Sequence, residues 1–329
     1  MATTDAILTE NLSRTFKKKR NEVMRALTEI NISVAPGQIY GFLGPNGAGK
    51  TTLIKILATL LYPSSGRAFV GGYDVVAKPH KVRPLINMVS GGETSGYGIL
   101  KVYENIYMFS RFYGIPSKVA KERIDHYLKK FDLANDARTK INRISTGMRQ
   151  KMNLIRGLVT DPQILFLDEP TLGLDVQIAR EVRSSLLEWV SENPSKTVFL
   201  TTHYMAEADQ MCHNIAIIDR GRIVASDTPA GLRKTAGGEN TYRLWLKPAV
   251  KDLSLLQKLP VVHSPYFGRR DEKEDSIEVC FAMDNESGLT DVLAAIKNAG
   301  HQVLRFAKEE ASLEDLFIKI VGRHLAENE

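Results

Sequence analysis

Cysteine is nearly absent from this chain of 329 residues, which contains only Cys212 and Cys280. Two cysteines so far apart are too few for a disulfide framework, which excludes the class of small secreted proteins that depend on such bonds. Their scarcity fits the reducing environment of a cytosol.

Long hydrophobic runs are also missing. The best apolar stretch, residues 53–61, is interrupted by Lys55 and is far shorter than the roughly 18 residues that a membrane-spanning helix needs. The first residues, M-A-T-T-D, lack the basic start and apolar core of a signal peptide. We therefore expect a soluble chain without a membrane span.

Charge of neither sign dominates, because 44 basic residues face 38 acidic ones for a net of +6. This balance is compatible with a neighbouring anionic lipid or nucleotide but requires neither. The only dense basic run, residues 17–20, lies between two expected strands and is interpreted as a solvated hairpin tip rather than a nucleic-acid or membrane patch.

Glycine is concentrated where it carries chemistry, in residues 44–52, which read G-P-N-G-A-G-K-T-T. An apolar strand over residues 38–43 precedes this loop and a helix follows it, as in the phosphate-binding motif G-x-x-x-x-G-K-[ST]. The glycines let backbone N–H groups point at an anion, and the helix N-terminus adds its positive end. Lys50 can reach the β- and γ-phosphates, and the Thr51 hydroxyl can bind Mg²⁺.

A second acidic strand is expected over residues 164–168, which read I-L-F-L-D and are followed by Glu169 and Pro170. Four consecutive apolar residues suit a strand that is buried on both faces of a parallel sheet. Asp168 is expected to hold Mg²⁺, directly or through water, and Glu169 to polarise the attacking water. Taken alone, the two carboxylates could also be a solvated strand end.

A serine–glycine turn, I-S-T-G-M at residues 144–148, precedes a third segment with helical apolar spacing. Ser145 is a candidate N-cap, so this turn predicts a second helix N-terminus that can bind an anion. An ordinary capped helix is the alternative interpretation.

These motifs together resemble the nucleotide-binding subunit of an ATP-binding cassette (ABC) transporter, strongly over residues 5–235. Residues 44–52 are similar to its Walker A motif, residues 164–169 to its Walker B motif, and I-S-T-G-M to its signature. Gly173, Leu174 and Asp175 match the D-loop, His203 the switch histidine, and Phe16 the aromatic residue that stacks on adenine. Core packing for Phe16 and His203, and an N-cap role for Asp175, are the competing interpretations.

The resemblance implies specific roles for these positions. Glu169, His203 and Lys50 are the expected catalytic residues, and Thr51 and Asp168 the expected metal ligands. The nucleotide-binding residues that it implies are Phe16, Gly44, Pro45, Asn46, Gly47, Ala48, Gly49, Lys50, Thr51, Thr52, Ser145, Gly147 and Asp175.

The chain departs from the family at the loop that normally carries a glutamine sensing Mg²⁺ and the γ-phosphate. After an apolar strand at residues 85–89, Gly91 holds the aligned position, and Glu93 is the nearest side chain that could replace the glutamine as a metal ligand. A solvated loop charge is the equal alternative for Glu93. The combination of S-G-x-E here with S-T-G-M in the signature resembles a drug-exporter branch of the family, of the daunorubicin-resistance type.

We expect an α/β fold: a P-loop NTPase of the ABC cassette type over residues 1–235, with a helical subdomain at about 97–160. A linker rich in glycine follows. Residues 241–329 are expected to form a small α+β ferredoxin-like domain in the order βαββαβ, including a helix over residues 249–259 and a final helix over 313–321. No catalytic cluster is predicted there, and a regulatory or dimer-supporting role is expected.

The resulting hypothesis is an ATP-hydrolysing subunit that binds ATP and Mg²⁺. It dimerises with itself, or with a second ATP-binding subunit, around two ATP molecules. It lies at the cytoplasmic face of the cell membrane and drives a separate integral-membrane permease, in the direction of export. The alternative is a soluble ABC ATPase acting on ribosomes or nucleic acid, which the single cassette and the missing basic linker disfavour. The cargo is not encoded in this chain.

Overall fold

The computed structural model describes residues 5–17, 23–91, 97–236, 241–250, 252–283, 286–309 and 311–321. The chain forms two compact units, Met1–Ser226 (unit 1) and Asp227–Glu329 (unit 2). This boundary lies before the expected position near residue 235, because α8 (Pro229–Ala236) packs on α11 (Leu313–Val321) within unit 2. Most of the basic run at residues 17–20, and Glu93, lie outside the described residues.

Unit 1 is built around a six-stranded sheet in the order β10-β9-β3-β8-β7-β6. The pairs β9–β3, β3–β8, β8–β7 and β7–β6 are parallel. Parallel strands covered on both faces are apolar along their length, and β3, β7 and β8 are buried throughout. The strands are β3 (Ile39–Leu43), β6 (Ile86–Ser90), β7 (Ile164–Asp168), β8 (Thr197–Thr202), β9 (Asn214–Asp219) and β10 (Arg222–Asp227).

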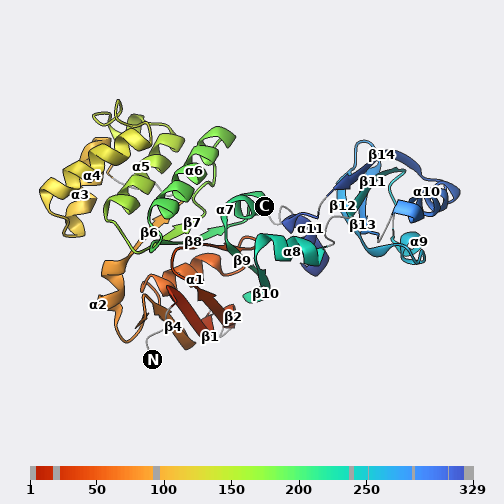
Figure 1. The fold of residues 1–329 in the computed structure, drawn as a ribbon, viewed down its shortest axis with the longest axis horizontal. Coiled ribbons are helices and arrows are strands. Elements are labelled where there is room, and N and C mark those ends of the chain that lie inside the picture. The colour runs from red at the N-terminus through yellow and green to blue at the C-terminus, as the bar shows by residue number, and fades with distance from the viewer. Residues whose placement is uncertain are drawn as a thin grey trace. The chain divides into compact units, whose positions relative to one another are not determined.

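A second, antiparallel sheet of unit 1 has the order β2-β1-β4-β5. Helix α1 (Lys50–Leu57) lies between the two sheets (Figure 1), and its buried side chains share one hydrophobic core with residues of both. The loop that precedes α1 is thereby fixed at the end of a helix that cannot shift without disturbing this core. The strands are β1 (Ile7–Lys17), β2 (Val23–Val34), β4 (Ser65–Val70) and β5 (Tyr73–Asp74).

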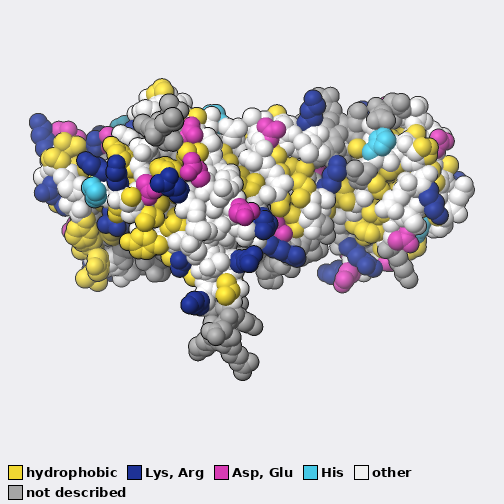
Figure 2. Space-filling model, turned by 90° about the horizontal axis from the view of Figure 1, so that it is seen from below, with side chains coloured by type: hydrophobic (Ala, Val, Ile, Leu, Met, Phe, Trp, Pro, Cys, Tyr) yellow, Lys and Arg dark blue, Asp and Glu magenta, His cyan; other side chains and the backbone are white. Residues whose placement is uncertain are grey.

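Helices cover the other side of the parallel sheet (Figure 1). They are α3 (Val102–Phe112), α4 (Ser117–Lys130), α5 (Thr146–Val159) and α6 (Val176–Glu192), and the shorter α2 (Pro79–Val82) and α7 (Met205–Met211) complete unit 1. On the face drawn in Figure 2, hydrophobic side chains are visible at the end that carries α3 and α4 and over unit 2 as well. Over the described parts of the chain, none of the helices combines the length and the hydrophobicity that crossing a bilayer requires.

Unit 2 contains a four-stranded sheet in the order β12-β13-β11-β14, and its three pairings are antiparallel. This order along a βαββαβ sequence is that of a ferredoxin-like split βαβ arrangement. One face of the sheet packs on α9 and α10 through an apolar core that includes Tyr242, Leu244 and Val279. The elements are β11 (Thr241–Lys247), α9 (Ser254–Gln257), β12 (His263–Asp271), β13 (Ser276–Ala282), α10 (Leu289–Asn298), β14 (Gln302–Glu309) and α11.

The prediction of a helix over residues 249–259 is wrong in length. Among the described residues of this segment, only the single turn α9 is helical. Pro248 and Pro260 flank the segment, and a proline disfavours helical backbone in the residue before it. The remaining stretch is too short for a helix to repay the cost of its nucleation without strong tertiary contacts.

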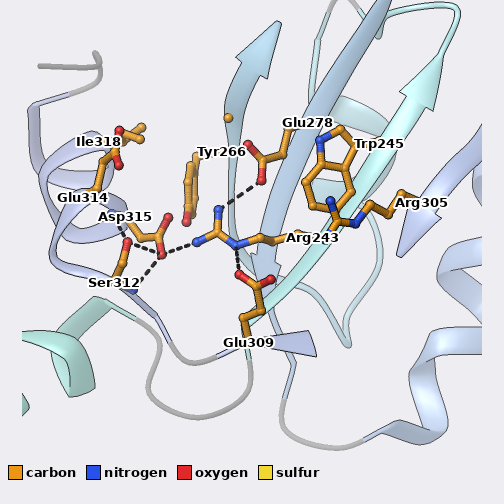
Figure 3. Close-up of a pocket in the computed structure, with 11 residues that line it drawn as sticks. Arg243, Trp245, Tyr266, Glu278, Arg305, Glu309, Ser312, Glu314, Asp315 and Ile318 are labelled. Carbon is orange, nitrogen blue, oxygen red and sulfur yellow. Dashed lines mark hydrogen bonds and ion pairs between the residues drawn. The ribbon is translucent and has the colours of Figure 1, made fainter. Parts of the chain in front are cut away.

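Arg243 on β11 fastens the final helix to the opposite face of this sheet (Figure 3). Its guanidinium lies 2.6 Å from Asp315 Oδ2, 3.0 Å from Glu278 Oε1 and 3.0 Å from Glu309 Oε2. Asp315 Oδ2 also accepts hydrogen bonds from the Ser312 amide and hydroxyl at the start of α11. Burial opposes the charge of Arg243, but the carboxylates outweigh it and raise the pKa of the guanidinium further above its ordinary value.

Replacement of Arg243 by alanine is expected to destabilise unit 2 by about 3–5 kcal/mol. The side chain of Asp315 is only 4% exposed, so its charge would remain buried without the guanidinium that compensates it. Hydrogen exchange of the β11 and α11 amides measures the loss. Arg305→Ala is the matched control, because Arg305 is exposed and stacks on Trp245. Equal protection of these amides from hydrogen exchange in Arg243→Ala and Arg305→Ala would contradict the prediction.

Candidate nucleotide-binding and hydrolysis site

The chemistry-bearing residues meet at the carboxyl ends of three adjacent parallel strands. Leu43 at the end of β3 pairs with Thr202 at the end of β8, and Thr201 pairs with Asp168 at the end of β7. Ligands of open parallel sheets bind outside this edge. The loop after β3, the carboxylates at the end of β7 and His203 after β8 therefore face one crevice.

Close packing requires glycine at two positions of the loop, Gly44 and Gly49, whereas Gly47 faces open space. A Cβ atom on Gly44 would lie 2.2 Å from the Ile218 carbonyl oxygen, and one on Gly49 would lie 2.4 Å from the Ala26 oxygen. Gly47 has a φ of 77° and nothing within 4 Å of its missing Cβ. Backbone at the tip of the loop is thus accessible to a ligand. The first amides of α1 have no intrahelical acceptor, so they are available for an anion.

Lys50, the first residue of α1, is buried at the base of this loop. Its ammonium donates to the carbonyl oxygens of Gly44 (2.7 Å) and Pro45 (3.3 Å), and it lies 2.9 Å from Glu169 Oε1. These contacts keep the charge compensated inside the crevice. Phosphate oxygens would be stronger partners than neutral carbonyls, so the ammonium is available to exchange them.

Glu169 lies between this ammonium and His203. The distance from Glu169 Oε2 to His203 Nδ1 is 2.8 Å, and since an ionised carboxylate only accepts, Nδ1 carries the hydrogen in this contact. Glu169 has a left-handed backbone conformation with a φ of 51°, and its amide donates to the Thr201 carbonyl (3.1 Å). Strain of this kind is found where surrounding contacts fix a functional side chain.

The surroundings of Glu169 keep its carboxylate charged. Burial by itself would raise the pKa, but the hydrogen bond with His203 and the charge of Lys50 outweigh it, so the pKa lies below the ordinary value of 4.5. The residue is therefore ionised at neutral pH and able to accept a proton.

Asp168 and Thr51 provide oxygen atoms of the kind that Mg²⁺ prefers. Asp168 is 8% exposed, and one of its oxygens accepts from the Thr201 hydroxyl (2.6 Å), which orients the other. A carboxylate and a hydroxyl that leave the remaining positions to water and phosphate match the usual Mg²⁺ environment. The donor set thus fits this ion, while Glu93, the third expected ligand, lies outside the described residues.

Gly91 has a steric role that the sequence did not reveal. Its amide donates to the Asp168 carbonyl (2.7 Å), and a Cβ atom on it would lie 1.8 Å from the Glu169 carbonyl oxygen. No side chain can occupy this position without displacing the backbone that carries both carboxylates.

Gly91→Ala is therefore expected to cost about 1–3 kcal/mol of stability. It should also lower ATP hydrolysis, because Glu169 must move away. Thermal unfolding and turnover of the purified chain measure the two effects. Gly114→Ala serves as a control, since a left-handed φ of 74° gives strain without any atom within 4 Å. If Gly91→Ala hydrolyses ATP as fast as Gly114→Ala does, the close approach of Gly91 to the Glu169 carbonyl is unimportant for hydrolysis.

Ser145 of the expected signature and Asp175 of the expected D-loop are helix caps in this chain. Ser145 is exposed, and its hydroxyl accepts from the Met148 amide (3.2 Å) at the start of α5. Asp175 caps α6 by accepting from the Ile178 amide (2.9 Å). A Cβ on Gly147 would lie 2.2 Å from Ile178 Cδ1, so this glycine allows α5 and α6 to approach closely. Their roles toward ATP stay predictions.

Phe16 is partly exposed near the end of β1, where it pairs with Met24. The guanidinium of Arg14 lies 4.5 Å from the centroid of its ring. Arg14 covers one face of this ring, and because the ring is not buried, a base can stack on the other face. The assignment to adenine remains a prediction.

Sequence patterns did not single out Thr201, whose hydroxyl contacts Asp168, nor the direct pairing of Lys50 with Glu169. The run V-F-L-T-T-H contained a signal, because hydroxyl residues at the end of a buried strand are placed to bond the neighbouring strand end.

Comparisons with known proteins agree with this geometry. A family model described as ABC transporter matches residues 27–172. The daunorubicin resistance ATP-binding protein DrrA3 of Streptomyces coeruleorubidus is 34% identical, over 93% of this chain and 94% of its own. The Nod factor export ATP-binding protein I of Burkholderia orbicola is 31% identical, over 90% and 92%.

Solved structures agree on the fold. An ATP-binding cassette, described as a dimeric post-hydrolysis state bound to ADP and Pi, superimposes with a TM-score of 0.62 at 24% identity, covering 68% of this chain and 98% of that one. Together with relatives that match nearly the whole chain, this similarity shows that the chain belongs to the ABC transporter family, as an ATP-hydrolysing, ATP-binding subunit.

Proposed function

We propose that two copies of this chain close around two Mg²⁺–ATP molecules and use their hydrolysis to drive a membrane permease that exports an organic solute. The observation that carries the proposal is the position of Glu169, 2.9 Å from the Lys50 ammonium and 2.8 Å from the His203 ring. A charged carboxylate between a phosphate-binding lysine and a histidine suits phosphoryl transfer to water, because it can orient the attacking water beside the phosphates.

In this proposal Lys50 exchanges the carbonyl oxygens of Gly44 and Pro45 and the Glu169 carboxylate for the phosphates of the nucleotide. Glu169, released from the ammonium, orients a water and accepts its proton as the water oxygen bonds to the γ-phosphorus. The bond from that phosphorus to the β–γ bridging oxygen breaks, which leaves ADP and phosphate. Thr51 and Asp168 would hold Mg²⁺, which would supply neutralisation of the charge on the phosphates.

Closure by a second copy is supported by what lies exposed beside the crevice. Leu172 and Val176, which flank the D-loop, are 40% and 83% exposed, and Ser145 lies exposed at the N-terminus of α5. Apolar side chains at such positions favour burial in an interface. Ser145 and Gly147 of the second copy would then meet the γ-phosphate and exclude water from it.

A docking surface for a permease is supported by a cavity of about 450 Å³ beside β6. Phe109, Phe112 and Tyr113 of α3 and its end line it, and Phe112 is 70% exposed. Aromatic side chains are typical anchors of protein interfaces. The cavity also includes Ser90, next to Gly91, so a docked permease helix would contact the strand that precedes the Asp168–Gly91 hydrogen bond.

Export is supported by relatives named for drug resistance and for Nod factor export. The second of these names describes transport, which favours this function over action on ribosomes or nucleic acid. A position at the cytoplasmic face of the membrane follows from the proposed permease partner.

The test is to isolate the full chain from membranes, identify the partner that co-purifies, and measure ATPase activity with candidate solutes. We expect an integral-membrane partner and ATPase activity that responds to a solute. A chain that co-purifies only with ribosomes or nucleic acid would refute the proposal.

A further inference from the structure

Glu207 on α7 is a buried carboxylate to which the roles above assign nothing. It is 4% exposed and bonds to residues from three other segments of unit 1. The Thr171 hydroxyl donates to its Oε2 (2.7 Å), the Thr202 hydroxyl donates to the same oxygen (3.3 Å), and Arg183 Nη1 lies 3.0 Å from Oε1. A buried charge is retained only where such partners compensate its desolvation.

The first of these bonds fixes the segment that follows Glu169. Thr171 is buried two residues after the base. Its carbonyl accepts from the Leu174 amide (3.2 Å), and the Leu172 amide bonds back to the Glu169 carbonyl (3.2 Å). The hydroxyl bond to Glu207 therefore anchors the turn in which Glu169 holds its left-handed backbone conformation.

The second bond fixes the residues on both sides of His203. The Thr202 hydroxyl donates to Glu207 and accepts from the Tyr204 amide (2.9 Å). The Thr202 carbonyl accepts from the Gly44 amide (3.4 Å) at the start of the phosphate loop. The position of the imidazole relative to Glu169 and to this loop thus depends on one hydroxyl.

The third bond joins this assembly to α6. Arg183 lies two turns after Asp175, which caps the helix. The D-loop segment is therefore flanked by two contacts with one carboxylate, at Thr171 before it and at Arg183 within α6 after it.

We propose that Glu207 is a positioning residue for ATP hydrolysis: it holds Glu169 and His203 in register by bonding Thr171 and Thr202 at once, and it couples this register to the D-loop through Arg183. The inference rests on the proposed roles of Glu169 and His203 at the reacting water. Since Glu207 contacts neither the phosphate loop nor these two residues, it acts on the rate of the chemical step rather than on nucleotide affinity.

The experiment measures kcat, KM and ATP affinity of the full chain carrying Thr171→Val, Thr202→Val or Glu207→Gln. Thr171→Val removes one hydrogen bond, and Thr202→Val removes two, those with Glu207 and with the Tyr204 amide. Both variants leave the ion pair of Glu207 with Arg183 intact. We expect kcat to fall about tenfold in each valine variant and about 10–100-fold in Glu207→Gln, with ATP affinity within about twofold of the unchanged chain. The two valine substitutions should be non-additive, because they act through the same carboxylate.

Thr197→Val is the matched control. Thr197 lies at the other end of the same strand as Thr202, is equally buried, and its hydroxyl accepts a hydrogen bond from the Gly37 amide. We expect Thr197→Val to lose about as much stability as the Thr171 and Thr202 variants do. Because Thr197 is remote from the crevice, the kcat of this control should stay within about twofold of the unchanged chain.

The inference is overturned if the Thr171 and Thr202 variants behave as the Thr197 control does, or if their loss appears in ATP affinity instead of kcat. If Glu207→Gln does not fold, the neutral valine variants still decide. Failure of the proposed function is recognised separately, because Glu169→Gln would then hydrolyse ATP at the normal rate.

Discussion

Glu169→Gln is expected to lower ATP turnover by about 100-fold or more, since it removes the group that we propose accepts the proton of the attacking water. Glutamine preserves the size of the side chain and an oxygen for the contact with His203 Nδ1, which is 2.8 Å from the carboxylate in this structure. It also removes a negative charge from beside the phosphates, so ATP binding should persist. If hydrolysis releases the closed dimer, as we propose, this variant should accumulate as an ATP-bound dimer.

Single-turnover hydrolysis and size-exclusion chromatography with ATP measure these two effects. Glu192→Gln is the matched control, because Glu192 is 54% exposed and pairs with Lys130 away from the crevice. Normal hydrolysis by Glu169→Gln would show that another group is the base.

The stability of the nucleotide-free chain should depend on pH through the lowered pKa of Glu169. A carboxylate whose pKa is lower in the folded state stabilises the fold above its unfolded pKa, and this contribution is lost as pH falls through the folded value. Without nucleotide, Glu169 therefore stays charged throughout the neutral range, and its contribution to stability should be lost only as pH falls below its ordinary pKa of 4.5. Thermal unfolding of the nucleotide-free chain at a series of pH values measures this loss.

Lys50→Ala is expected to weaken ATP binding by about 10–100-fold, the usual worth of a charge-assisted hydrogen bond, and to abolish turnover. The Lys50 ammonium is buried at the base of the phosphate loop. No other residue of α1 places a cation at that position. Its loss also removes one of the charges that keep the pKa of Glu169 low, so this pKa should rise.

Equilibrium binding of a fluorescent ATP analogue tests the prediction without depending on turnover. Lys55→Ala, an exposed lysine one turn further along the same helix, should bind as the unchanged chain does. Unchanged affinity in Lys50→Ala would contradict the assignment of residues 44–52 as the phosphate loop.

Local patterns predicted much of the fold. The strands around residues 38–43 and 164–168 and the helix after the glycine loop are confirmed, because buried parallel strands and glycine-led helix starts have strong local signals. The βαββαβ order of unit 2 is present as well. The helix over residues 249–259 failed because tertiary packing, rather than composition, decides whether so short a segment is helical.

The sequence alone determined which chemistry the chain can perform, since the loop around Lys50, the strand before Asp168 and the turn before His203 each carry their signal in a few consecutive residues. Only the tertiary structure decided how these groups act together. The Lys50–Glu169–His203 contacts, the closeness of Gly91 to the Glu169 backbone, and the bonds of Glu207 all join residues that are distant along the chain. Such contacts follow from the register and order of the parallel strands, which bring separate strand ends to one edge of the sheet.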